Sequence, residues 1–254
     1  MATSQRTAGS GHWKRAIFTA LLLFTPGRAT ASGLALAVGA GYDYQAGPAG
    51  ETWNAPLAFG TMVVDGGDAT LSLSRYHSSE VGWGWSGAGN VGLSFSSRAG
   101  ARVIGIRSIG DGDYRAWRAE AGPTIQLDED RSLFLYGAHL EDNRGARLNQ
   151  IGAEGNAPLG VHFSGLASAA FGKWEGSESS AQGTAGVTWS RWKELQVIGQ
   201  ATFGKNIVGP PSAESGGSTG PLGVGGRGHS GRPTTGPTSA LEAAAFVGIR
   251  LMVP

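Results

Sequence analysis

The chain has 254 residues, no cysteine, 44 glycines and a formal charge of +1. Without cysteine it can form neither disulfides nor cysteine-type zinc sites. A charge this close to zero offers no basic patch of the kind that nucleic-acid binding needs, so we expect no nucleic-acid partner. The high glycine content suits a curved sheet better than helices, because glycine in a helix interior costs about 1 kcal/mol relative to alanine.

The first 31 residues have the three parts of a cleaved secretory signal. Basic residues precede an apolar run at 16–24, and a small-residue cleavage site ends at Ala31. The apolar run is roughly half the ~20 residues that a membrane-spanning helix needs, which argues against an N-terminal anchor. We therefore expect cleavage between Ala31 and Ser32. The removed region carries four basic residues and no acidic one, so the remaining domain, 32–254, would have a formal charge of −3.

Apolar residues alternate with small or polar residues along most of this domain. From Gly33 to Gln45, for example, Leu34, Leu36 and Val38 alternate with small residues, which is the period of two typical of a β-strand. Twelve segments show the pattern, and we predict a strand for each. The predicted strands are Gly33–Gln45, Asn54–Val64, Asp68–Tyr76, Gly87–Ser97, Ala101–Ile109, Arg115–Leu127, Ser132–Glu141, Ala146–Gly155, Gly160–Gly172, Ala181–Arg191, Leu195–Asn206 and Ala240–Val253.

The links between these strands are expected to alternate in length. The short links are 65–67, 98–100, 128–131, 156–159 and 192–194. The links between them are mostly longer, at 46–53, 77–86, 110–114, 142–145, 173–180 and 207–239. Short periplasmic turns, longer external loops and an even strand number are typical of outer-membrane barrels. About half of 209–239 is glycine and proline, so we expect a long external loop, with a plug inside the lumen as the alternative.

These patterns predict an all-β fold, a closed antiparallel up-and-down transmembrane β-barrel of about twelve strands. The apolar alternate face is explained if it contacts lipid, since only a closed sheet satisfies every backbone group inside a bilayer. A secreted soluble β-sandwich that binds a ligand is the alternative, and it would bury the same face. Aromatic residues near strand ends on the long-loop side favour the barrel, because they resemble an interfacial girdle. They are Tyr44, Trp53, Tyr76, Trp83, Trp85, Trp117 and Trp174.

The last strand resembles the C-terminal strand of the bacterial outer-membrane β-barrel superfamily. Those proteins end in a strand with a glycine followed by alternating hydrophobic residues. Here Leu241 to Val253 alternate in the same way, and Gly248 stands three residues before Leu251. Val253 and Pro254 occupy the place of the family's terminal aromatic residue. The resemblance spans 32–254, picks out no subfamily, and implies insertion by the barrel-assembly machinery.

Ionisable residues within the strands are expected to face the barrel interior. A charge facing lipid at mid-depth costs about 2 to 4 kcal/mol, which favours inward placement whatever the function. Such residues would either brace the barrel as paired charges or line a narrow pore. The predicted lumen-lining residues are Arg118, Glu120, His139, Glu141, Glu154, Glu242 and Arg250.

A possible catalytic group follows the third predicted strand. His77 and Ser79 form a His-x-Ser pair, which resembles the pair that lipid-hydrolysing outer-membrane barrels carry at the outer end of a strand. A neutral histidine can act as general base for a serine hydroxyl, and Glu80 supplies an acid that could orient it. Chance proximity of histidine and serine is the simpler explanation, so an outer-membrane lipid hydrolase or deacylase remains an alternative function.

The sequence therefore predicts an integral outer-membrane barrel without enzymatic activity, either a narrow passive channel or a structural component of the envelope. We expect no cofactor and no metal, since no phosphate loop, dinucleotide fingerprint or metal spacing occurs. The expected partners are outer-membrane lipid and lipopolysaccharide. Nothing in the residues indicates the solute.

Overall fold

The computed structural model describes residues 35–46, 52–64, 66–78, 82–128, 130–175, 179–192, 195–205 and 242–253. They contain twelve strands, all within the compact unit 33–254, and no helix among them is long and apolar enough to cross a membrane. The strands are β1 Ala35–Ala46, β2 Thr52–Val64, β3 Gly67–Ser78, β4 Gly82–Ser94, β5 Ala99–Gly110, β6 Arg115–Gln126, β7 Ser132–Asp142, β8 Arg147–Gly160, β9 Phe163–Trp174, β10 Ser179–Trp192, β11 Leu195–Lys205 and β12 Glu242–Val253.

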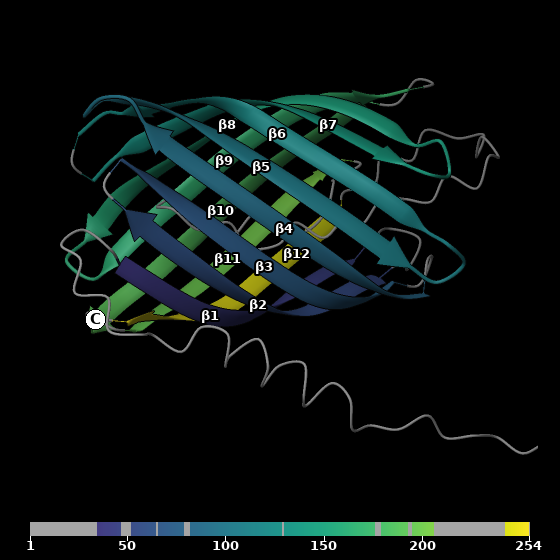
Figure 1. The fold of residues 1–254 in the computed structure, drawn as a ribbon, viewed down its shortest axis with the longest axis horizontal. Helices are drawn as coiled ribbons and strands as arrows, with labels where there is room; N and C mark the ends of the chain where they lie inside the picture. Colours follow the sequence, from purple (N-terminus) through teal and green to yellow (C-terminus); the bar gives the residue numbers. More distant parts are fainter. Residues whose placement is uncertain are drawn as a thin grey trace, which may run out of the picture. The chain divides into compact units, whose positions relative to one another are not determined.

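The strands close into one barrel (Figure 1). Each strand pairs antiparallel with its neighbours in the chain, and β1 pairs with β12 from Leu36 opposite Val253 to Ala46 opposite Ala243. Because closure leaves no free strand edge, the wall satisfies its backbone hydrogen bonds within the sheet. The predicted all-β closed antiparallel barrel of twelve strands is confirmed.

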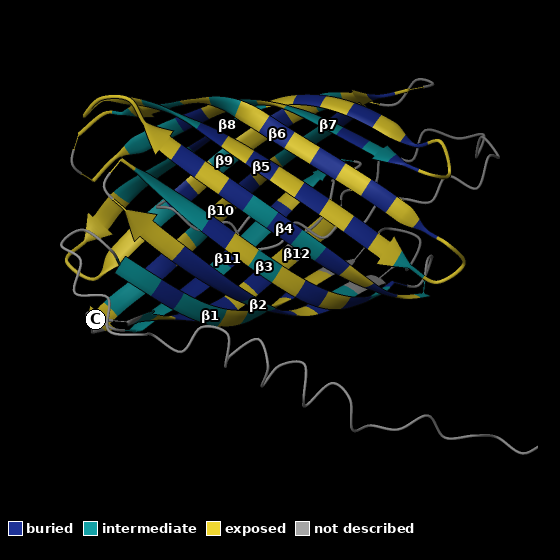
Figure 2. Ribbon diagram, viewed as in Figure 1, coloured by how far each residue is buried: buried dark blue, intermediate teal, exposed yellow. Residues whose placement is uncertain are grey.

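Successive side chains of each strand point to opposite sides of the wall. In β5, Arg102, Ile104 and Ile106 are buried inside, whereas Val103 and Ile109 are exposed outside. The same alternation appears as stripes along the strands in Figure 2. Large apolar side chains project outward around the barrel, among them Leu71, Leu73, Val91, Val103, Ile151, Phe171, Phe203 and Val247.

The two ends of the barrel differ less in link length than the sequence predicts. At one end, here called the turn end, β1 begins, β12 ends and the links are 65–66, 95–98, 127–131, 161–162 and 193–194. At the opposite end, the loop end, the links are 47–51, 79–81, 111–114, 143–146, 175–178 and 206–241. Only the last of these is long, because β2, β3, β4, β9 and β10 continue further toward the loop end than the alternation of apolar residues indicates. The segment 209–239 lies outside the described residues.

The two largest corrections are each of five residues: β8 continues through the predicted turn 156–159 to Gly160, and β4 begins earlier than predicted. The sequence predicts a loop up to Ser86, but the strand begins at Gly82. Glycine at 82 and 84 hides the alternation, in which Trp83 points outward and Gly84 inward. Gly84 has a structural reason to lack a side chain, because a Cβ there would collide with the ring of Tyr76 on the neighbouring strand. Because Tyr76 packs so closely against this position, only glycine fits there, and glycine does not show the alternation by which a strand is recognised in the sequence.

Candidate functional site: the charged interior of the barrel

Among the described residues, two ion pairs lie inside the barrel. On β6, Arg118 and Glu120 are two residues apart, so they share the inner face, and Arg118 Nε donates to Glu120 Oε1 at 2.6 Å. Both side chains are almost fully buried. Charged hydrogen bonds of this kind are stronger than neutral ones, and burial without a partner would be costly. Separating Arg118 from Glu120 would leave two buried charges without partners, so their burial stabilises the pair.

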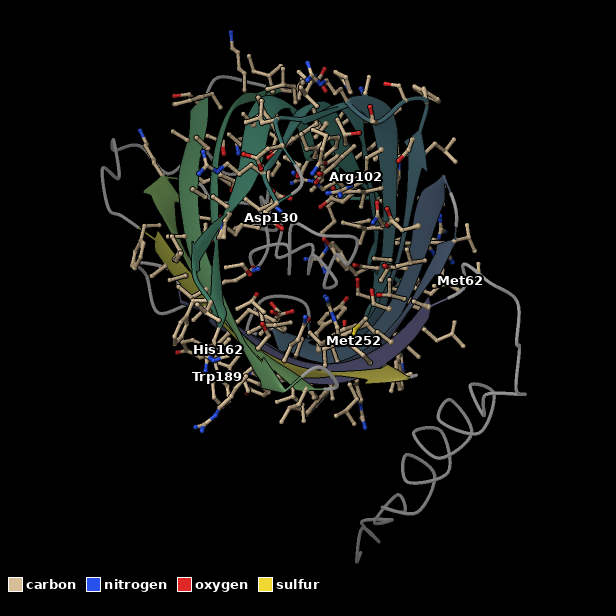
Figure 3. The ribbon with its side chains drawn as sticks, turned by 90° about the vertical axis from the view of Figure 1, so that its left-hand side faces the viewer. Met62, Arg102, Asp130, His162, Trp189 and Met252 are labelled. Atoms are coloured by element: carbon tan, nitrogen blue, oxygen red, sulfur yellow. The ribbon has the colours of Figure 1, made fainter. Side chains whose placement is uncertain are left out.

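The second pair joins strands that are not neighbours. Arg102 on β5 lies 3.6 Å from Glu154 on β8, and β6 and β7 stand between them in the wall. The position opposite Arg102 on β6 is Gly122, which carries no side chain in its path. Arg102 also lies over the ring of Phe134, 5.2 Å from its centroid. In Figure 3 the Arg102 side chain points into the barrel, while Met62 lies on the outside of the wall.

Neutral hydrogen bonds line other parts of the inner face. Thr61 bonds Thr70 at 3.1 Å, and Thr184 bonds Thr202 at 2.7 Å, each joining adjacent strands. Opposite the ion pairs, Arg250 on β12 donates to Gln196 at 3.1 Å. The interior therefore combines hydroxyl, amide and charged groups, which bind water and polar solutes more readily than lipid.

An apolar layer occupies the inner face near the loop end of β3 to β9. Its members come from the ends of five strands and two adjoining links, and Tyr76 anchors it by donating its hydroxyl to the Ile109 carbonyl at 3.0 Å. The layer lies closer to the loop end than either ion pair. Its buried side chains at this end are Tyr76, Tyr114, Ala116, Leu140, Ala146, Leu148 and Trp174.

The structure places four of the predicted lumen residues inside the barrel, namely Arg118, Glu120, Glu154 and Arg250. The side chain of Glu242 lies outside the described residues. The prediction is wrong for His139 and Glu141, which share the outer face of β7 with Leu133 and Leu135. Both stand near the loop end, where the outer surface leaves the hydrocarbon depth and charge is tolerated. The His139 ring contacts Trp117 in a tilted arrangement, with ring centroids 5.0 Å apart.

The aromatic prediction divides in the same way. Tyr44, Trp83, Trp85 and Trp117 are exposed on the outer face. The prediction is wrong for Tyr76 and Trp174, because both point inward and belong to the apolar layer. Nearness to a strand end does not decide the side of the wall; the alternation does. The side chain of Trp53 lies outside the described residues.

The possible catalytic pair is only half described. His77 points outward, as its alternation with Leu71 and Leu73 predicts, and its ring centroid lies 4.8 Å from that of Trp83. Ser79 and Glu80 lie outside the described residues, so the His-x-Ser site stays a prediction. Ala31 and Ser32 lie outside them as well.

Three buried charged residues, Arg102, Asp43 and Asp142, are absent from the residues that the sequence predicts to line the lumen. Arg102 shares its face with Ile104 and Ile106, so apolar neighbours hid its direction. Asp43 shares the inner face of β1 with Gly39 and Gly41, is 1% exposed, and has no hydrogen-bond partner among the described residues. Strict alternation from the outward Tyr42 and Tyr44 was the available signal for Asp43.

A closed antiparallel barrel with an apolar outer face and a charged interior defines the class of transmembrane β-barrels. No protein-family model and no curated protein sequence matches the chain. Among solved structures, the KdgM porin is similar with a TM-score of 0.53 and 8% identity, over 85% of this chain and 98% of that one. The NanC porin has a TM-score of 0.56 and 6% identity, over 85% and 98%. The chain thus has the fold of bacterial outer-membrane β-barrel porins.

Proposed function

We propose that the chain is an outer-membrane β-barrel that forms a narrow passive channel and has no enzymatic activity. The observation that carries this proposal is the contrast between the two sides of the wall, with exposed Leu71 and Ile151 outside and two buried ion pairs inside. Lipid suits the outer side and water the inner one. The likeness to porins supports the fold on which the proposal rests.

The interior argues for a small, weakly cation-preferring passage. In an eight-stranded barrel, side chains can fill the interior. A twelve-stranded barrel is only modestly wider, so any passage through it is narrow. Among the described inward residues, carboxylates outnumber arginines, and rings of carboxylates favour cations. The carboxylates are Asp43, Asp68, Glu120, Asp142 and Glu154, and the arginines are Arg102, Arg118 and Arg250.

Conductance across a planar lipid bilayer tests the proposal. The folded protein, identified by heat-modifiable migration after outer-membrane fractionation, should give small openings with a reversal potential that favours cations. Glu120→Gln should reduce this preference, because the interior loses a negative charge. The matched control is Glu141→Gln on the outer face, which should leave the preference unchanged. Folded protein that gives no openings contradicts the channel.

A further inference from the structure

Arginine and tryptophan alternate over the outer face of β3 to β6 near the loop end. The strand register places Arg75 opposite Trp85, and Arg107 opposite Trp117. Arg115 follows on β6, opposite Ile109. All six side chains project outward, and the arginines and tryptophans among them are exposed. We call this surface, made of Arg75, Trp83, Trp85, Arg107, Arg115 and Trp117, the outer basic patch.

The arginines of the outer basic patch have no acidic partner among the described residues. None of the three forms an ion pair there, and Arg75 instead lies 4.7 Å from the ring centroid of Trp83. The nearby carboxylate of Asp111 accepts a hydrogen bond from the backbone N–H of Trp83 at 2.9 Å. Within the part of the chain that the structure describes, no carboxylate therefore pairs with these arginines, and their positive charge can attract an external anion.

The adjoining sector of the same outer face is built differently. On β8, Arg147 lies 3.0 Å from Glu141 and 3.3 Å from Glu175. The register links this cluster to the patch, because Glu141 is opposite Trp117. Among the described residues, Arg147 is thus paired with two carboxylates, whereas Arg75, Arg107 and Arg115 of the patch are paired with none. Arg147 and the arginines of the patch all lie on the outer face near the loop end, so their position at the membrane interface does not explain why only Arg147 is paired.

The geometry of the patch suits a phosphate above an acyl chain. Arg107 and Arg115 are diagonal neighbours across β5 and β6, a separation of about 7–8 Å, so both guanidinium groups can reach one phosphate. Toward the middle of the wall the outer face carries the small residues Gly89, Gly105 and Ala119. A Cβ on Gly105 would meet no atom within 4 Å. An acyl chain can therefore lie flat against the wall directly below the arginines.

We propose that the outer basic patch binds the phosphorylated headgroup of an anionic glycolipid in the outer leaflet. Arg107 and Arg115 hold one phosphate, Arg75 binds a second charged group, and the tryptophans lie at headgroup depth. His77, whose ring contacts that of Trp83 in a tilted arrangement, belongs to the edge of this surface. The inference rests on the proposed membrane-spanning barrel with its loop end outward, but it does not depend on an open channel.

Native mass spectrometry of the folded full chain in detergent, titrated with diphosphoryl lipid A, tests the proposal. The double variant Arg107→Gln/Arg115→Gln should bind about tenfold or more weakly, since charged hydrogen bonds to phosphate are lost. Wild-type protein should bind the dephosphorylated lipid as weakly as the variant binds the diphosphoryl form. Arg147→Gln is the matched control, because its arginine is already paired with glutamates, and it should bind like wild type.

Heat-modifiable migration of each variant separates lost binding from lost folding. Equal affinity of wild type and the double variant, or equal affinity for the lipid with and without phosphate, overturns the proposal. So does an equal loss in Arg147→Gln. A folded wild-type protein that binds no glycolipid defeats only this inference, whereas a protein that never gives the heat-modifiable form defeats the proposed barrel in the membrane.

Discussion

The outer and inner faces of the barrel wall are built from the same strands but meet opposite requirements. Outside, Leu71, Ile151 and Phe171 are between 62% and 70% exposed, although each could have been buried in a soluble core. Inside, Arg118 and Glu120 are almost fully buried and paired. A water-soluble β-sandwich would show the reverse distribution. The comparison indicates that the sheet separates a lipid phase from a polar one.

The largest expected effect comes from placing a charge on the outer face. Leu71→Arg should lower the free energy of unfolding in lipid vesicles by about 2–4 kcal/mol, because Leu71 lies mid-strand on the outward side. Denaturant titration followed by tryptophan fluorescence measures the change.

The neighbouring residue provides the matched control. Ser72 points inward and is only half-buried, so Ser72→Arg places the same charge in the polar interior and should cost clearly less. Similar losses at 71 and 72 would show that the two sides of the wall do not differ, and the comparison would break.

A smaller effect is expected inside the barrel. Glu154→Gln leaves Arg102 buried without its ion-pair partner and should cost about 2–3 kcal/mol of unfolding free energy. Glu141→Gln breaks a pair of far more exposed side chains on the outer face and should change stability little. The same denaturant titration compares the two variants.

A double variant sharpens this second prediction. Arg102→Met combined with Glu154→Gln removes both charges, so it should be less destabilised than Glu154→Gln alone. Additive losses in the double variant would mean that the two side chains are not coupled across the interior.

The smallest effect concerns packing of the inner apolar layer. Gly84→Ala should cost about 1–2 kcal/mol, because its Cβ would collide with the Tyr76 ring and with the backbone carbonyl oxygen of Ile109. Tyr76→Leu removes the ring but leaves the carbonyl, so part of the cost of Gly84→Ala should disappear in the Tyr76→Leu background. An undiminished cost there would place the strain elsewhere. A double-mutant cycle by denaturant titration measures the coupling.

The number and order of strands were predictable because the period of two survives wherever lipid-facing positions stay apolar. The period of two is not visible at the start of β4. There the Tyr76 ring occupies the space of a side chain at Gly84, and the first five residues of the strand resemble a loop. The predicted β4 therefore stops short of the loop end. The barrel itself was not affected, since no other predicted strand depended on that boundary.

Side-chain direction was predictable at mid-depth and much less so near the rims. Arg118 and Glu154 lie inside, as predicted, because a charge that faces lipid at mid-depth is destabilising. His139 and Glu141 lie outside because water and headgroups replace hydrocarbon at that height. Tyr76 and Trp174 lie inside because the apolar layer needs large side chains. The direction of Arg102 was not predictable, because it shares its face of β5 with the apolar residues Ile104 and Ile106.

Site-directed spin labelling along β3 tests the central claim most directly, and the chain has no native cysteine to interfere. Single labels would replace Leu71, Ser72, Leu73 and Ser74 in protein reconstituted into lipid vesicles. The barrel predicts that labels at 71 and 73 relax with the lipid-soluble agent oxygen, and that labels at 72 and 74 relax with a water-soluble metal chelate. Equal aqueous access at all four positions would contradict a membrane-spanning wall.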